Sequence, residues 1–192
     1  MRVLFLQLSD IHVKTDTDAV LSRADAIVSS VRNLDYQVEG CVVCFTGDVA
    51  FSGDEAQYVA FTKFADAIAS GLHAHLGPDP KASPVPVHMF AVPGNHDCNF
   101  DIETSARPIL ANAIRVDPAK ASESALAAPC LEVQTPFFSA MSALGAIGDQ
   151  CSPRFDKRLG HQAQFSTSRA PGSAFSVSTR LCSQPSARSR ER

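Results

Sequence analysis

The sequence has no tryptophan, only two tyrosines and no surplus of positive charge. Its formal net charge is −3 and its isoelectric point is about 6.0, so no global positive field would attract nucleic acid. The scarcity of tryptophan and tyrosine also argues against a platform on which bases could stack. We therefore do not expect nucleic acid as a partner.

Long apolar runs are also missing. No stretch approaches the roughly 20 apolar residues of a membrane-spanning helix. The apolar run near the N-terminus stops at Ser9-Asp10 and is shorter than the roughly 7–15 apolar residues in a signal peptide. We expect a cytoplasmic protein with no membrane partner. The hydrophobic share of 45% is sufficient for a folded core.

Six cysteines occur, but without a secretory signal they do not predict a disulfide framework. Cys41 and Cys44 form a Cys-x-x-Cys pattern, which is found in redox and zinc motifs. They lie within an apolar run typical of a buried strand, where residues three apart point to opposite faces. We therefore interpret both as packing residues.

Apolar runs and helical periodicities alternate along the chain. This order predicts an α/β domain with a sheet that is at least partly parallel. Strands are expected at 2–8, 40–46 and 86–92, and helices at 18–33, 52–75, 102–116 and 131–147.

Three local expectations accompany this pattern. The first strand is nearly all apolar, which predicts burial on both faces. Asp16 or Thr17 is expected to cap the first helix. Pro108 is expected to interrupt the helix at 102–116.

Polar residues follow each of the three expected strands. Ligands of open α/β sheets bind at the carboxyl ends of the strands, so these residues should meet at one edge. The clusters are Asp10-Ile11-His12, Gly47-Asp48 and Gly94-Asn95-His96-Asp97. Each cluster taken singly is also compatible with an ordinary turn or a helix cap, and the joint occurrence carries the interpretation.

The donor atoms of these clusters suit a metal ion. Carboxylates, imidazoles and an amide carbonyl are ligands for Mn, Fe or Zn, and the absence of cysteine argues against a structural thiolate zinc site. Asp10 and His12 point the same way on an extended segment, so both can reach one ion.

In this order the motifs resemble a known family. The matching segments are Ser9-Asp10-Ile11-His12, Thr46-Gly47-Asp48 and Val92-Pro93-Gly94-Asn95-His96-Asp97, which resemble the first three signature blocks of calcineurin-like metallophosphoesterases. The resemblance is specific over residues 2–100 and looser to about 165. It implies a domain at 1–165, followed by a Ser/Arg-rich tail at 166–192 in which we expect low order.

The resemblance implies two divalent metal ions. Asp10 and His12 would bind the first ion, Asp48 would bridge both, and Asn95 would bind the second. A metal-bridging hydroxide would then attack the phosphorus of a phosphate ester.

Two further residues receive catalytic roles from the resemblance. His96 would lie near the phosphate as a proton donor or transition-state stabiliser, and Asp97 would orient His96.

The sequence departs from the family after this point. The family continues with a further histidine and a Gly-His-x-His block, whereas only His161 follows position 97 here. We interpret His161 as a surface residue, so the second metal site is expected to be incomplete. The expected fold is a partial metallophosphoesterase sandwich, in which helices flank a mixed, partly parallel sheet and the C-terminal half is missing. A frameshift between about 165 and 175 would explain the change in composition.

The predicted function is metal-dependent hydrolysis of a phosphate ester, impaired by truncation. The alternatives are a non-catalytic interaction module and half of a split enzyme that a complementing chain completes. A nucleic-acid-binding protein that uses the Arg-rich tail is a third, weaker alternative. The sequence does not distinguish monoesters, diesters, cyclic nucleotides and nucleic acids as substrates.

Overall fold

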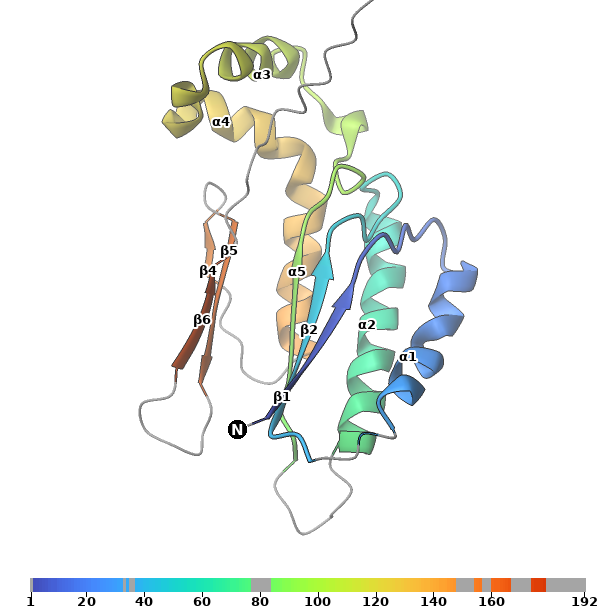
Figure 1. The fold of residues 1–192 in the computed structure, drawn as a ribbon. Coiled ribbons are helices and arrows are strands. Elements are labelled where there is room, and N and C mark those ends of the chain that lie inside the picture. The colour runs from blue at the N-terminus through green and yellow to red at the C-terminus, as the bar shows by residue number, and fades with distance from the viewer. Residues whose placement is uncertain are drawn as a thin grey trace, which may run out of the picture.

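The fold was analysed in a computed structural model of the chain. The structure describes residues 2–32, 34, 37–76, 84–147, 154–156, 160–166 and 174–178. Its first sheet consists of β1 (Val3–Leu8), β2 (Gly40–Thr46) and β3 (Val87–Val92) in the order β1-β2-β3 (Figure 1). Both strand pairs are parallel, which confirms the predicted α/β class.

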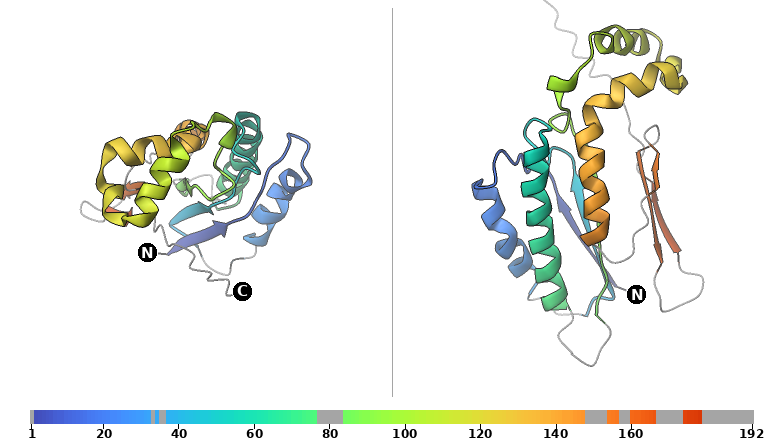
Figure 2. Two further views of the ribbon diagram at one scale, coloured as in Figure 1. Left: turned by 90° about the horizontal axis from the view of Figure 1, so that it is seen from above. Right: turned by 180° about the vertical axis from the view of Figure 1, so that it is seen from behind.

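Three helices cover one face of this sheet (Figure 2). They are α1 (Ala24–Ser30), α2 (Glu55–Leu76) and α5 (Thr135–Ile147). Helix α2 packs between α1 and α5. The ring of Phe61 in α2 packs edge to face against the ring of Phe45 in β2, with ring centroids 4.8 Å apart. The core therefore lies between the sheet and α2.

The first helix is shorter than the predicted span 18–33. The chain first forms a 3-10 turn at Ala19–Arg23, and α1 follows it. Asp18, and not Asp16 or Thr17, provides the cap, because its side chain accepts a hydrogen bond from the backbone N–H of Val20 at 3.2 Å.

Strand β1 is exposed on one face, so the prediction of burial on both faces is wrong. Alternate residues along β1 are exposed, and Phe5 is 59% exposed. Leu4, Leu6 and Leu8 point instead toward the helices and pack against the core. The apolar pattern was misleading because β1 lies at the edge of the described β1–β3 sheet, where the outer face is not covered.

The two cysteines of the Cys-x-x-Cys pattern occupy opposite faces of β2. Cys41 belongs to the core under the helices, whereas Cys44 lies outside that cluster. Both thiols are free and buried, and burial raises the pKa of each to about 12. Thiols with such pKa values are not reactive at neutral pH, which agrees with the predicted packing role.

A helical segment follows β3. It contains α3 (Arg107–Val116) and α4 (Ser124–Leu131), and 3-10 turns at Phe100–Ile102, Pro118–Ser122 and Glu132–Gln134. Pro108 lies in the first turn of α3, so the predicted interruption of a helix at this proline is wrong. A proline is tolerated there because the first N–H groups of a helix have no intrahelical partner.

The described chain ends in a second sheet. Antiparallel strands β4 (Arg154–Asp156), β5 (Gly160–Ser166) and β6 (Ala174–Ser178) form it. Strand β6 falls within the predicted tail at 166–192, and the tail residues 167–173 and 179–192 lie outside the described residues. In the part of the chain that the structure describes, no helix combines the length and apolar character needed to cross a membrane.

Candidate metal centre

The loops after β1 and β2 continue side by side beyond the sheet. The backbone N–H of Asp10 donates to the carbonyl of Gly47 at 3.2 Å, and that of His12 donates to the carbonyl of Asp48 at 2.9 Å. These bonds hold the first two polar clusters together at the carboxyl ends of the strands, as the sequence predicts.

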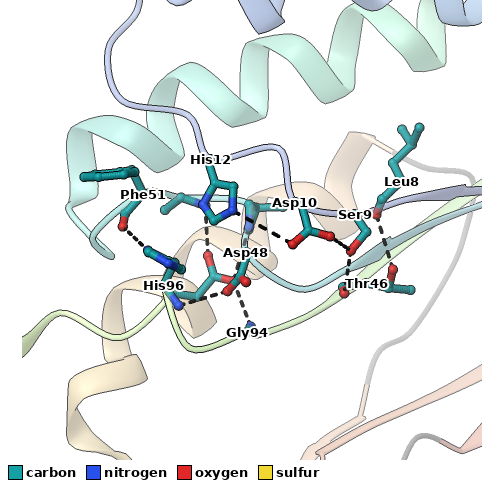
Figure 3. A network of polar contacts seen from close by, with 12 residues as sticks. Leu8, Ser9, Asp10, His12, Thr46, Asp48, Phe51, Gly94 and His96 are labelled. Carbon is teal, nitrogen blue, oxygen red and sulfur yellow. Dashed lines mark hydrogen bonds and ion pairs between the residues drawn. The ribbon is translucent and has the colours of Figure 1, made fainter.

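Three predicted metal ligands meet at this edge. Asp10, His12 and Asp48 each offer a ligand atom, and these atoms lie within 4.8 Å of one another (Figure 3). The Nδ1 atom of His12 is buried and has no hydrogen-bond partner among the described residues. Two carboxylates and an imidazole with an unsatisfied nitrogen fit a divalent transition metal.

The same three residues have unusual backbone conformations. Asp10, His12 and Asp48 have φ values of 56°, 51° and 54°, and they are the non-glycine residues with positive φ in the described part of the chain. This left-handed region costs a non-glycine residue about 1–3 kcal/mol, and such strain is concentrated at functional sites. The fold therefore holds all three candidate ligands in a conformation that local preference disfavours. The prediction that Asp10 and His12 lie on an extended segment is wrong at both residues.

The loop after β3 anchors Asp48. The backbone N–H of His96 donates to Oδ1 of Asp48 at 2.9 Å. Gly94 lies so close to Asp48 that a Cβ atom at position 94 would overlap the carboxylate and lie 2.6 Å from the Asp48 backbone nitrogen. This close approach requires a glycine, and it joins the third cluster to the second.

His96 lies beside the cluster. Its ring centroid is 4.6 Å from that of His12, at a nearly perpendicular angle. Its Nδ1 atom is 2.7 Å from the carbonyl oxygen of Phe51. A carbonyl oxygen only accepts hydrogen bonds, so Nδ1 carries a proton and Nε2 is the nitrogen left to face a ligand.

Asp97 is fully buried and ties the loops together. Its carboxylate accepts hydrogen bonds from the backbone N–H groups of Val49, Ala50 and Gly94 at 3.3, 2.9 and 2.9 Å. The hydroxyl of Tyr58 donates to the same carboxylate at 3.2 Å. Asp97 thus connects the loops after β2 and β3 to helix α2.

This arrangement differs from the role expected for Asp97. The family resemblance implied that Asp97 orients His96. In the structure the carbonyl of Phe51 contacts the His96 ring, and the Asp97 carboxylate accepts hydrogen bonds from Ala50 and Tyr58. Burial raises the pKa of Asp97, although the hydrogen bonds that it accepts act in the opposite direction. Burial and the nearby Asp97 charge also raise the pKa of Tyr58.

The remaining predicted residues are located as follows. Asn95 is exposed and lies in the loop after β3. It stands between Gly94, which approaches Asp48, and His96. His161 lies on β5, and the structure does not describe the side chains of this strand. Asn95 remains a predicted ligand on the basis of its position in the motif.

Sequence reasoning missed several residues around the centre. Phe51 contacts His96 through its carbonyl, and Lys14 lies over the Phe51 ring. Gln57 accepts hydrogen bonds from the backbone N–H groups of Phe51 and Ser52. Their nearness to the predicted motifs in the sequence was the available signal. The hydrogen bonds each use a backbone atom of Phe51 or Ser52, which leaves no pattern of residue types.

Comparison with known proteins identifies one family. The model of the family described as calcineurin-like phosphoesterase matches residues 3–139. The matched region runs from β1 into α5 and includes all three polar clusters. No curated protein matches the sequence.

Proposed function

Because the chain belongs to the calcineurin-like phosphoesterase family, we propose that Asp10, His12 and Asp48 bind a divalent metal ion at which a phosphate ester is hydrolysed. The observation that carries this proposal is the shared backbone strain of the three residues. Three adjacent carboxylate and imidazole side chains are common on protein surfaces, but left-handed conformations at all three are not.

The residues around the proposed metal ion have different roles. Bound divalent ions of this family supply positive charge against the phosphate oxygens and a nucleophile at neutral pH. Asp48 and Asn95 are proposed as ligands of a second ion, with Mn, Fe or Zn as the candidates. His96 would hold or donate a proton at Nε2, since its Nδ1 is engaged by Phe51. Asp97 would keep the loops in register.

The experiment measures metal binding and hydrolysis separately. The full chain is titrated with Mn²⁺, and hydrolysis of a generic aryl phosphate ester is followed with Mn²⁺ present. Asp48→Asn should weaken Mn²⁺ binding at least about tenfold and abolish any hydrolysis, because it removes a charged ligand. Asp54→Asn is the control: it removes a carboxylate charge nearby in sequence and retains a side-chain oxygen for the helix cap. Equal Mn²⁺ binding by both variants and the unaltered chain would contradict the proposal.

A second candidate function is a metal-binding module without turnover. It is favoured by one observation: among the described residues, the His, Cys, Asp and Glu side chains form a single three-residue group, which is sufficient for one ion. Mn²⁺ binding that requires Asp48, without hydrolysis at any metal concentration, would support this alternative. Hydrolysis restored by a second polypeptide would instead indicate half of a split enzyme.

A further inference from the structure

Phe51 is an exposed aromatic side chain beside the proposed metal centre. It is 43% exposed. Its ring centroid lies 5.6 Å from that of His96 and 6.3 Å from that of His12. Figure 3 shows the Phe51 ring next to both imidazoles, at one end of the cluster. A molecule bound at the metal centre would therefore find an apolar surface on this side.

The position of Phe51 is fixed by its backbone. Its N–H lies 3.1 Å from the carbonyl of Val13 and 3.1 Å from Oε1 of Gln57, and its carbonyl contacts Nδ1 of His96 at 2.7 Å. Because the backbone is held from two sides, the point from which the side chain extends is kept at a set distance from the centre. A pre-positioned aromatic residue loses less conformational entropy when a ligand packs on it than a residue in a free loop would.

Lys14 adds a positive charge to this surface. Its Nζ atom lies 4.7 Å from the centroid of the Phe51 ring. Its backbone N–H donates to the Asp18 carboxylate at 3.1 Å, which holds the segment after His12 in place. The ammonium group lies beside the ring in a cation–π contact, and its positive charge favours an anionic ligand on this surface.

We propose that Phe51 and Lys14 form the surface that receives the alcohol part of the substrate, and that this part is aromatic. This inference rests on the proposed function. An anionic phosphate ester of an aromatic alcohol matches both features, since its ring can pack against Phe51 while its charge is attracted by Lys14. Aromatic pairs prefer offset or edge-to-face packing, which the partly exposed ring permits.

Phe100 provides a matched comparison. It is 54% exposed, and the guanidinium carbon of Arg107 lies 5.2 Å from its ring centroid. An exposed phenylalanine paired with a cation is therefore not distinctive by itself, and single exposed apolar residues are normal. Phe51 differs because its ring lies against the two imidazoles of the proposed centre.

The test compares two non-hydrolysable ligands. Phenylphosphonate and methylphosphonate carry the same anionic group and differ in the aromatic ring. Their dissociation constants are measured by calorimetry with the Mn²⁺-loaded full chain. Phenylphosphonate should bind about 3- to 10-fold more tightly, as expected for one aromatic pair. Phe51→Ala should abolish this preference, whereas Phe100→Ala should retain it.

The outcomes separate this inference from the proposed function. Tight Mn²⁺ binding with equal affinity for the two phosphonates overturns the inference and leaves the proposed function standing. A preference that survives in Phe51→Ala, or that is lost equally in Phe100→Ala, also overturns it. If Mn²⁺ does not bind, the proposed function fails and the inference fails with it.

Discussion

Individual residues of the candidate metal centre are held in place by contacts from other loops. The left-handed backbone at Asp10, His12 and Asp48 would relax in an isolated peptide, because no local interaction compensates for its cost. The hydrogen bonds between the first two loops and the approach of Gly94 to Asp48 supply that compensation. The strength of the centre at this scale depends on how closely three backbones approach one another.

The first residue-scale prediction concerns Gly94. Gly94→Ala should weaken Mn²⁺ binding at least about tenfold, because the added methyl group must displace the Asp48 carboxylate from its position. It should also lower the free energy of unfolding by about 1–3 kcal/mol, as expected for overpacking. Calorimetric Mn²⁺ titration and urea unfolding measure the two effects.

Gly40→Ala is the matched control for this prediction. A Cβ atom at position 40 has no neighbour within 4 Å, so this variant should bind Mn²⁺ like the unaltered chain. If Gly94→Ala binds Mn²⁺ as well as Gly40→Ala does, Asp48 is not the ligand that the close approach positions.

At the scale of secondary structure, α2 connects the core to the candidate metal centre. Gln57 in its first turn binds the loop after β2, and Tyr58 one position later binds Asp97. The rest of the helix packs on the sheet through Phe61, Phe64 and Ile68. The helix thus anchors the loops at the carboxyl ends of β2 and β3 to the packed core.

The element-scale prediction removes one hydroxyl from α2. Tyr58→Phe keeps the buried ring but leaves the Asp97 carboxylate with one donor fewer. The free energy of unfolding should fall by about 1.5–3 kcal/mol, the range for a hydrogen bond to a charged group. Urea unfolding of the full chain measures this change.

Thr62→Val serves as the control on the same helix. It also deletes one hydroxyl, but that hydroxyl only bonds the Tyr58 carbonyl within the helix at 2.8 Å. It should destabilise the chain by less than Tyr58→Phe does. Equal losses for both variants would show that the Asp97 contact contributes nothing particular to stability.

At the scale of the whole molecule, the helices leave one side of the first sheet open at β1. Phe5 and Val3 are exposed there, on the edge strand of the described β1–β3 sheet. An exposed apolar edge strand can pair with another copy of the chain, because its backbone groups are free to form a further ladder.

The whole-molecule prediction concerns self-association. Phe5→Thr should shift the full chain toward monomer, because it removes apolar surface from the edge and retains a residue that favours strands. Sedimentation velocity over a range of concentrations measures the shift. Val59→Thr is the control, because Val59 is 58% exposed on helix α2 and lies away from this edge. An unchanged distribution in Phe5→Thr, or an equal shift in Val59→Thr, would contradict the role of β1.

The sequence by itself determined the α/β class, three strands in an at least partly parallel sheet, and the meeting of three polar clusters at their ends. These follow from hydrophobic periodicity and from the rule that ligands bind at the carboxyl ends of parallel strands, both of which depend only on local order along the chain. The family followed from the same motifs, and the family match confirmed it.

Only the tertiary structure decided what each residue of the centre contacts. The carbonyl of Phe51, rather than Asp97, holds the His96 ring, and Asp97 became a buried link between two loops and α2. The sequence also did not reveal the open face of β1, because an apolar strand has the same residue pattern whether or not other elements cover its second face. These properties depend on backbone atoms and on neighbours distant in sequence, which residue types do not encode locally.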